Sequence, residues 1–382
     1  MSTHPARRRQ LRTWLPAMKQ EHLQVVAADS TYGPELLDLA SNDYLSLCRH
    51  PSLIAAAEAQ LRFSGLGASG SRLVSGSRPV HEQLESELAQ WLGRESVLLF
   101  PSGFQANLAA VKALANRNTT VVADRLIHHS LLVGVQASGA RLRRFVHNDL
   151  ESLERLLKRC HSERPDTPLL VITESLFSME GTSPRVHDMA ALCERHEASL
   201  LLDEAHALGV LGEGGRGLGF GEGRVTMLSG TFGKAFGSGG AFLACDGELG
   251  EKLLQESGAF RYTTALAPPL AAGALAALEL MQNNPDWGLT LVKRSNIWRD
   301  RLVEAGWARP TGDGPILPLL VGEDQQCLNL QRHLELSGIV TGAIRPPTVP
   351  EGSARLRLVL HRLLPDETLG LLLRALSDSR VP

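Results

Sequence analysis

The sequence has few features of a secreted, metal-binding or membrane protein. Its five cysteines are scattered and form no C-x-x-C pair, which indicates a reducing compartment and argues against structural zinc. Acidic and basic residues nearly balance, 41 against 39, so no strong field favours nucleic acid or an anionic membrane. No apolar run is long enough to span a membrane, and the opening MSTHPARRRQ lacks a signal peptide's apolar core. We therefore expect a soluble cytoplasmic protein.

The length of 382 residues is enough for two or three structural units. Between residues 96 and 245, short apolar runs alternate with amphipathic helical stretches. This alternation predicts an α/β fold with a mainly parallel sheet that helices cover on both faces. The expected strands are 96–100, 119–124, 141–147, 168–174, 199–205 and 225–230, and residues 239–245 could add a further strand.

The organisation of the chain predicts three parts. Residues 1–45 would form an N-terminal arm and residues 46–285 a large domain that carries the sheet. Residues 286–382 differ in pattern, with short strands and helices that suggest a small C-terminal α/β domain with an antiparallel sheet. The sequence contains no internal repeat.

An acid and a lysine stand at strand ends in the centre of the chain. Asp203 directly follows the apolar run 200–202, and ligands of open α/β sheets bind at the carboxyl ends of strands. Lys234 lies in the glycine-flanked stretch TFGKAFG, where the backbone can be approached closely. Read singly, Asp203 is a turn residue and Lys234 a solvated side chain. Read together, they suit pyridoxal phosphate, which needs a lysine for its aldehyde and a carboxylate for its pyridinium nitrogen.

Other strand-like runs also end in groups that suit a cofactor. The turn PSGF at residues 101–104 precedes a helix, and N–H groups at a helix start can bind phosphate. Three more polar groups follow apolar runs, namely His128, Ser178 and Thr231. A histidine in this position either closes a turn by a hydrogen bond or stacks on a pyridine ring. Suitable groups at five strand ends strengthen the cofactor interpretation.

Two other motifs indicate different ligands but lack the required context. The glycines of GEGGRG match G-x-G-x-x-G, yet DEAHALG precedes them instead of a strand, and Lys234 lies downstream where an acid is needed. His128, His129, Asp203 and His206 could be combined into a metal site, but adjacent histidines point apart. We therefore expect neither a dinucleotide nor a metal ion.

The chain resembles the α-oxoamine synthases, a family of fold-type I pyridoxal-phosphate enzymes. The likeness covers nearly the whole sequence, through ASNDYLSL, GASGSRLVSGS, PSGFQAN, ADRLIHHSL, TESLFSMEG, LDEAHALGVLGEGGRG, TFGKAFG, RYTTALAP, AIRPPTVP and ARLRL. The form AIRPPTVP favours a member that uses L-alanine and a pimeloyl thioester over sister enzymes that use glycine or serine. In one departure from the family, Leu364 stands where a histidine usually follows the ARLRL strand.

The resemblance implies how the cofactor would be held. Lys234 would bind it covalently, Asp203 would pair with the pyridinium nitrogen and His128 would stack on the ring, so these three are the expected catalytic residues. The other expected cofactor contacts are Gly103, Phe104, Ser178, Thr231, His206 and, from the neighbouring subunit, Thr263 and Thr264.

The resemblance also implies substrates and a partner. Arg345 would bind the carboxylate of alanine, and the other substrate-binding residues would be Thr348, Asn42, His128 and, for the far carboxylate of the acyl donor, Arg12. The reaction would be a decarboxylative condensation that releases carbon dioxide and a thiol carrier, either coenzyme A or an acyl carrier protein. Thr263 and Thr264 imply a homodimer with shared active sites. The alternatives are a sister enzyme that uses glycine and a non-catalytic protein that kept the fold.

Overall fold

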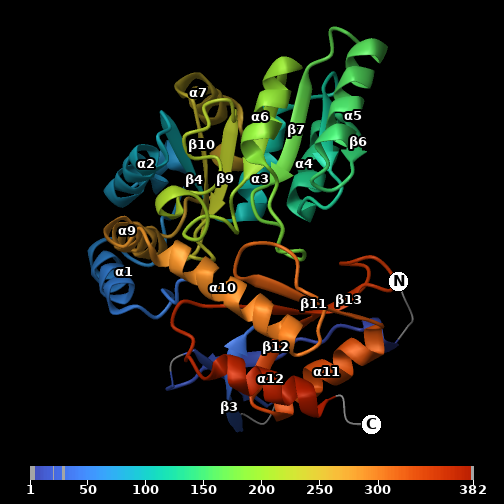
Figure 1. Cartoon of the computed structure of the whole chain (residues 1–382). Coiled ribbons are helices and arrows are strands. Elements are labelled where there is room, and N and C mark those ends of the chain that lie inside the picture. The colour runs from blue at the N-terminus through green and yellow to red at the C-terminus, as the bar shows by residue number, and fades with distance from the viewer. Residues whose placement is uncertain (1–4, 20, 28–30, 380–382) are drawn as a thin grey trace. The chain divides into compact units, whose positions relative to one another are not determined.

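The computed structural model describes residues 5–19, 21–27 and 31–379 (Figure 1). The chain divides into two compact units. The first contains the N-terminal residues to Ser46, the segment Ser178–Thr182 and the chain from Leu289 onward, and the second contains Leu47–Phe177 and Ser183–Gly288. The N-terminal residues, expected to form a separate arm, belong to the first unit because strand β3 (Tyr32–Leu39) pairs with β12 (Ile339–Ile344).

The second unit is built on a seven-stranded sheet in the order β4-β10-β9-β8-β7-β5-β6. Only β10 runs antiparallel to its neighbours, so the predicted α/β fold with a mainly parallel sheet is confirmed. The strands are β4 (Ser96–Phe100), β5 (Thr120–Asp124), β6 (Arg141–Phe145), β7 (Leu169–Glu174), β8 (Ala198–Asp203), β9 (Met227–Thr231) and β10 (Ala241–Cys245).

Helices cover both faces of this sheet (Figure 1). On one face α3 and α4 pack their small and aliphatic side chains on alternate strand residues, such as the fully buried Val121, Leu170 and Leu201. The two helices approach closely at Gly134, where a Cβ would lie 2.9 Å from the side chain of Val111. The helices of this unit are α1 (Pro51–Ser64), α2 (Pro79–Leu92), α3 (Gly103–Leu114), α4 (His129–Ser138), α5 (Leu150–Glu163), α6 (Val186–Arg195), α7 (Gly247–Glu256), α8 (Gly258–Arg261) and α9 (Pro268–Asn283).

The glycine- and serine-rich stretch between α1 and α2 differs from expectation in one detail. The composition predicts no regular element there, but the structure contains a short π-helical segment, η2 (Arg72–Gly76). Gly76 packs directly on the carbonyl of Gly70, where any side chain would collide. The small residues therefore allow a tight loop to fold on itself.

The first unit contains a six-stranded sheet in the order β1-β2-β3-β12-β13-β11. Its pairs are antiparallel except for β3 with β12. The remaining elements are η1 (Pro5–Arg7), β1 (Thr13–Pro16), β2 (His22–Val26), α10 (Trp287–Glu304), which begins in the second unit, β11 (Ile316–Gly322), α11 (Asp324–Leu336), β13 (Ala354–Val359) and α12 (Thr368–Asp378).

Candidate active site

The carboxyl ends of the parallel strands in the second unit carry a cluster of polar residues. Strands β7, β8 and β9 are in register so that Glu174 lies opposite Asp203, and Asp203 opposite Ser229. Because parallel strands end at the same edge of a sheet, the residues at these ends form one rim. Asp203 is one of the predicted site residues, whereas Glu174, which ends β7 as Asp203 ends β8, is not among them.

Asp203 is held at the end of β8 by hydrogen bonds to both of its carboxyl oxygens. Its Oδ1 accepts from the backbone N–H of Ala205 at 2.9 Å, and its Oδ2 accepts from Nδ2 of Asn107 at 2.7 Å. The side chain is buried, as is that of His206, which follows three residues later. A fixed carboxylate in a buried position can bind a protonated ring nitrogen.

The first turn of α3 provides a site for an anion beside β9. Ser102 caps the helix, its Oγ accepting from the backbone N–H of Gln105 at 3.3 Å. Gly103 faces the side chain of Thr231, so that an added Cβ would lie 3.7 Å from it. N–H groups in the first turn of a helix bind phosphate well, and Gly103 and Phe104 are in that turn.

Lys234 lies in a tight turn after β9. The hydroxyl of Thr231 donates to the carbonyl of Gly240 at 3.0 Å and accepts from the N–H of Gly233 at 3.3 Å. The carbonyl of Lys234 accepts from the N–H of Gly237 at 2.8 Å. Gly237 has φ +60° and packs on the backbone of residues 47 and 48, so a side chain there would clash. The turn therefore fixes the backbone from which the half-buried lysine side chain extends.

His128 and Glu174 are joined at the start of α4. The backbone N–H of His128 donates to Oε1 of Glu174 at 2.6 Å, and its Nδ1 lies 2.7 Å from Oγ of Ser130. Burial lowers the pKa of His128, although the charge of Asp203 opposes this effect. Burial, together with the charge of Asp203, raises the pKa of Glu174 well above its usual range. The rim therefore combines a neutral imidazole with a carboxyl group that resists ionisation.

The predicted phosphate contacts Thr263 and Thr264 follow α8. The Oγ1 of Thr263 accepts a hydrogen bond of 2.6 Å from Nε2 of Gln105, which lies on α3 of the same chain. Thr264 is exposed and its backbone pairs with Ser71. A hollow of about 430 Å³ at this surface is lined by Ser71, Leu73, Val74, Arg261, Tyr262, Thr263 and Thr264.

In the first unit, the buried guanidinium of Arg357 contacts two of the predicted site residues. Its Nη2 donates to Oδ1 of Asn42 at 2.9 Å and its Nε to the carbonyl of Ser178 at 2.6 Å. Arg357 is only 6% exposed, and within the described ranges no carboxylate lies at ion-pair distance from it. Burial raises the pKa of Tyr44, which also donates to Oδ1 of Asn42, to about 12. Arg357 belongs to the quoted ARLRL motif, but the sequence analysis gave it no role.

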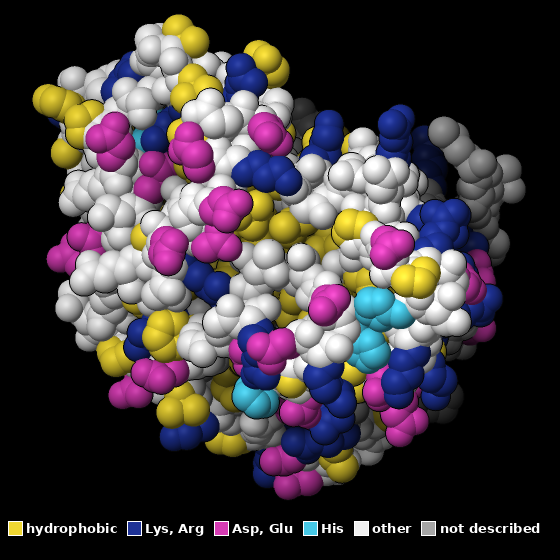
Figure 2. All heavy atoms as spheres, turned by 90° about the horizontal axis from the view of Figure 1, so that it is seen from above, with side chains coloured by type: hydrophobic (Ala, Val, Ile, Leu, Met, Phe, Trp, Pro, Cys, Tyr) yellow, Lys and Arg dark blue, Asp and Glu magenta, His cyan; other side chains and the backbone are white. Residues whose placement is uncertain are grey.

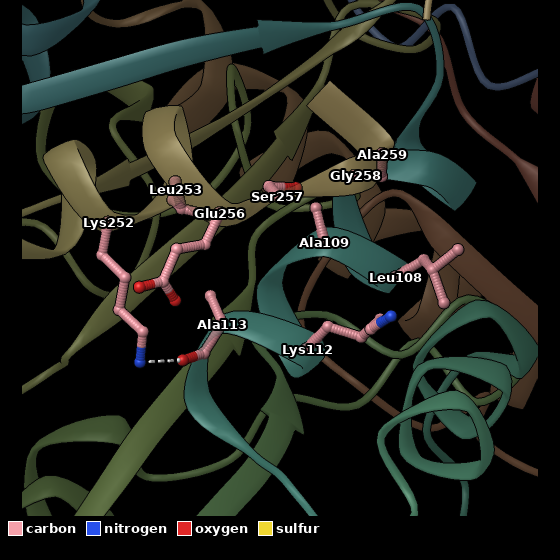
Figure 3. Close-up of a pocket in the computed structure, with 10 residues that line it drawn as sticks. All are labelled: Leu108, Ala109, Lys112, Ala113, Lys252, Leu253, Glu256, Ser257, Gly258 and Ala259. Carbon is pink, nitrogen blue, oxygen red and sulfur yellow. Dashed lines mark hydrogen bonds between the residues drawn. The ribbon is translucent and has the colours of Figure 1, made fainter. Parts of the chain in front are cut away.

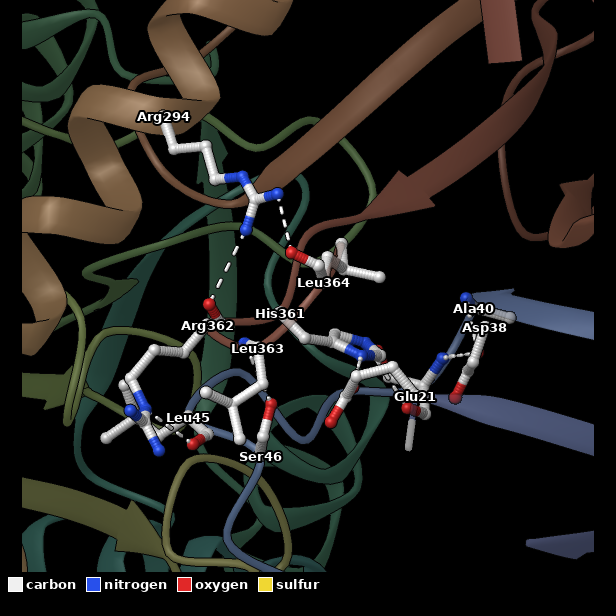
Figure 4. Close-up of polar contacts among 11 residues, drawn as sticks. Glu21, Asp38, Ala40, Leu45, Ser46, Arg294, His361, Arg362, Leu363 and Leu364 are labelled. Carbon is white, nitrogen blue, oxygen red and sulfur yellow. Dashed lines mark hydrogen bonds and ion pairs between the residues drawn. The ribbon is translucent and has the colours of Figure 1, made fainter. Parts of the chain in front are cut away.

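The turn that follows β13 contacts the chain between Ser41 and Ser46, and Figure 4 shows its contacts with Leu45 and Ser46. Arg362 donates from its backbone N–H to the carbonyl of Tyr44 at 2.8 Å and from Nε to that of Leu45 at 3.0 Å. His361 lies between the carbonyl of Ser41, at 3.1 Å, and Oε2 of Glu21, at 2.8 Å. Burial alone would lower the pKa of His361, but Glu21 reverses the effect and the pKa is raised.

Leu364, which stands where the family usually has a histidine, lies in the same turn. The carbonyl of Leu364 accepts from Nη2 of Arg294 at 2.6 Å, and its side chain is buried (Figure 4). The departure from the family pattern at this position is therefore accommodated by packing.

The remaining predicted substrate residues have partners within the first unit. Nη1 of Arg345 donates to the carbonyl of Ala6 at 2.5 Å. Thr348 is exposed, and its Oγ1 accepts from Nη2 of Arg9 at 2.7 Å. Arg12 forms an ion pair with Glu335 and stacks on Trp14. Their roles toward substrate stay predictions.

A separate cavity of about 290 Å³ lies between α3 and the helices α7 and α8 (Figure 3). Apolar side chains, two lysines and Glu256 line it, and Lys252 donates from Nζ to the carbonyl of Ala113 at 2.9 Å. None of the predicted site residues is among its lining residues, so it is distinct from the candidate site.

The distribution of charged side chains on the surface is consistent with the near-neutral composition. Basic and acidic side chains are interspersed over the face shown in Figure 2. No helix among the described residues is long and apolar enough to cross a membrane. In the same residues, no group of three His, Cys, Asp or Glu side chains is arranged to hold a metal ion.

Comparisons with known proteins show relatives of similar length and fold. The family "Aminotransferase class I and II" matches residues 34–376. The 8-amino-7-oxononanoate synthase of Chromohalobacter salexigens is 43% identical over 344 residues, which cover 89% of this chain and 88% of the relative. A Francisella tularensis 8-amino-7-oxononanoate synthase structure has a TM-score of 0.76 at 27% identity, covering 90% of this chain and 96% of its own. The structure of the S. paucimobilis serine palmitoyltransferase K265A, with bound PLP-myriocin aldimine, has a TM-score of 0.89 at 25% identity. The match covers 96% of this chain and 92% of that one.

Proposed function

Because the chain belongs to the aminotransferase class I and II family, and within it to the 8-amino-7-oxononanoate synthases, we propose that it condenses L-alanine with a pimeloyl thioester. The products are 8-amino-7-oxononanoate, carbon dioxide and the free thiol carrier, in a step of biotin biosynthesis. The resemblance to the α-oxoamine synthases is thereby confirmed. The supporting feature of the site is Asp203, buried at the end of β8 beside the strand that leads to Lys234.

Pyridoxal phosphate is the cofactor of this family, and the second unit has groups that fit it. The first turn of α3, with Gly103 and Phe104, suits the phosphate because it offers backbone N–H groups at a helix start and no side chain at Gly103. Asp203 suits the pyridine nitrogen, and the aldehyde requires the amine of Lys234. Thr231, His206, Ser178 and His128 are proposed as further contacts.

The bound cofactor supplies an electron-accepting ring that stabilises negative charge on the α-carbon of alanine. Asp203 keeps the ring nitrogen protonated, because its carboxylate accepts the N–H hydrogen bond. The amine of Lys234 would take the α-proton of alanine at Nζ. His128 supplies a neutral imidazole face, which does not repel a positively charged ring.

We further propose that the carboxylate of alanine binds Arg357 together with Asn42. Arg357 is buried, and its hydrogen-bond partners among the described residues, which include the amide of Asn42 and the carbonyl of Ser178, are neutral. A buried cation with neutral partners gains strongly from an anionic ligand. Oδ1 of Asn42 is occupied by Arg357 and Tyr44, so its Nδ2 is the group left to donate to a ligand. The earlier expectation of Arg345 in this role remains the competing assignment.

The active form is proposed to be a homodimer in which Thr263 and Thr264 serve the partner's phosphate. The surface around these threonines supports a partner, because Val74 and Tyr262 are 83% and 79% exposed beside the hollow described above. Exposed apolar side chains around a hollow are typical of an interface. The hydroxyl of Thr263 is held by Gln105 of its own chain, which would fix its position for the partner.

Substrate assays test the proposal directly. The purified enzyme, loaded with pyridoxal phosphate, is incubated with pimeloyl-coenzyme A or pimeloyl-acyl carrier protein and either alanine or glycine. We expect 8-amino-7-oxononanoate, identified by mass spectrometry, only with alanine. Turnover with glycine and acetyl-coenzyme A instead would assign the chain to a sister activity, and the ratio of the two pimeloyl donors identifies the carrier.

A further inference from the structure

A buried chain of hydrogen bonds connects Asp203 to His128 through two residues that the sequence analysis overlooked. Asn107, on α3, donates from Nδ2 to Oδ2 of Asp203 at 2.7 Å and to Oγ of Ser130 at 2.9 Å. Ser130, on α4, has its Oγ 2.7 Å from Nδ1 of His128. Its backbone N–H donates to the same nitrogen at 3.3 Å. Both linking residues are buried, Ser130 completely, so water does not replace these bonds.

The direction of each hydrogen bond follows from the side-chain amide of Asn107, whose oxygen accepts and whose nitrogen donates. Its Oδ1 accepts from the hydroxyl of Ser229 at 2.6 Å, which fixes the orientation of the amide. Both hydrogens of Nδ2 are then used, one by the carboxylate of Asp203 and one by Oγ of Ser130. Since Oγ of Ser130 accepts from Asn107, its single hydrogen is available for Nδ1 of His128.

The nitrogen Nδ1 of His128 therefore meets two donors, the hydroxyl and the backbone N–H of Ser130. A proton on Nδ1 would face both of them. The hydroxyl of Ser130 would then have to turn its hydrogen away from Nδ1, and this buried group would lose that hydrogen bond. The arrangement consequently favours an unprotonated Nδ1.

We propose that Asn107 and Ser130 are positioning residues that fix His128 as the neutral tautomer with its proton on Nε2, in a hydrogen-bond chain that begins at Asp203. The burial that lowers the pKa of His128 acts in the same direction. The close approach of α3 and α4 at Gly134 makes the link possible, because it brings Asn107 and Ser130 within hydrogen-bond distance.

The importance of this tautomer for catalysis rests on the proposed function. If His128 stacks on a cofactor ring that Asp203 keeps positively charged, an imidazolium would repel the ring, whereas a neutral imidazole does not. The fixed tautomer also leaves one donor, Nε2–H, for an oxygen of cofactor or substrate. The same carboxylate would thus hold the ring nitrogen and, through Asn107 and Ser130, set the state of His128.

The tautomer is measurable without cofactor or substrate. We suggest ¹⁵N-histidine labelling of the full-length apoprotein and long-range ¹H–¹⁵N spectra at pH 7.5, with His128→Gln to identify the signals. We expect a pyridine-type Nδ1 and a pyrrole-type Nε2 in the wild type. In Ser130→Ala, which loses one donor, we expect both nitrogens to shift toward averaged values. A protonated Nδ1 in the wild type, or an unchanged spectrum in Ser130→Ala, would overturn the proposal.

A matched variant separates this effect from a general loss of packing. Ser295→Ala also removes a fully buried serine hydroxyl, which donates to the carbonyl of Leu291 in α10, and should leave the His128 signals unchanged. With pyridoxal phosphate and alanine present, Ser130→Ala should lower kcat about tenfold, or about 1.4 kcal/mol, with KM for alanine unchanged. The apoprotein spectra do not depend on turnover, so a wrong substrate assignment would leave them intact.

Discussion

Arg357 and Asn42 share a hydrogen bond of 2.9 Å in which the guanidinium Nη2 donates to the amide oxygen. We predict that Arg357→Lys weakens alanine binding about a hundredfold, or about 2.7 kcal/mol, because the carboxylate loses the two-point contact that a guanidinium makes in a buried position. Lysine keeps the charge but not the planar fork. The measurement is an alanine titration followed by the absorbance of the bound cofactor, with thermal unfolding to verify the fold.

Arg345→Lys is the matched control for this prediction. In the wild type the guanidinium of Arg345 donates to the carbonyl of Ala6, so we expect the variant to bind alanine with nearly unchanged affinity. A large effect in Arg345→Lys with none in Arg357→Lys would reverse the assignment and return the carboxylate to Arg345.

Lys234→Ala tests the covalent attachment of pyridoxal phosphate. We expect the variant to fold, to bind the cofactor without a covalent bond and to lose turnover completely. After borohydride reduction, mass spectrometry should find the cofactor on the peptide with Lys234 in the wild type and nowhere in the variant. Lys252→Ala is the control, because that lysine is exposed and donates from Nζ to the carbonyl of Ala113, away from the predicted site residues. Cofactor fixed on another lysine in Lys234→Ala would contradict the assignment.

The shared active site predicts complementation between two inactive variants. One is Lys234→Ala and the other combines Thr263→Val with Thr264→Val. In a hybrid dimer, one site joins the intact lysine to the intact threonines. Equal mixing gives about half hybrids with one good site each, so about a quarter of the wild-type activity should return. If subunit exchange is verified by mass spectrometry and activity stays absent, the threonines act within their own chain.

Acid should destabilise the protein partly through His81. This side chain is fully buried, accepts from the backbone N–H of Arg78 and lies 2.8 Å from the carbonyl of Leu266. Burial lowers its pKa to about 4. The unfolded chain therefore binds a proton near pH 6.5 that the folded one does not. The free energy of unfolding should fall by about 3 kcal/mol between pH 6.5 and 4 on account of this group.

Urea unfolding at several pH values and fixed protein concentration measures this contribution. In His81→Gln the free energy of unfolding should fall less between pH 6.5 and 4, by the amount assigned to His81. A variant with the same pH dependence as the wild type would show that another group is responsible.

Local pattern was sufficient to predict much of the second unit. The alternation of apolar runs and amphipathic helices predicts all seven strands of its sheet, and Asp203 stands out because a charge ends an apolar run. Glu174 carries the same signal in β7, because it too is a charge that ends an apolar run. Recognising it required the register, which places it opposite Asp203.

The sequence pattern could not predict contacts between segments that are distant in the chain. Asn107 reads as an ordinary helix residue, and only the packing of α3 on the sheet brings it to Asp203. Arg357 reads as a strand residue of alternating pattern, and its burial against Asn42 depends on residues more than three hundred positions earlier. Periodicity reports which face of an element is apolar, whereas such pairings depend on topology.

The parallel pairing of β3 with β12 also bears on how the chain folds during synthesis. Leu37 lies opposite Ile339, so roughly 300 residues must be translated between the two halves of this pair, which takes tens of seconds at typical rates. During that interval β3 presents an unpaired edge, while the whole second unit is synthesised and leaves the ribosome. The hairpin partner β2 is available at once and covers one side of β3. The other side stays open to chaperones, or to a neighbouring nascent chain, until β12 emerges.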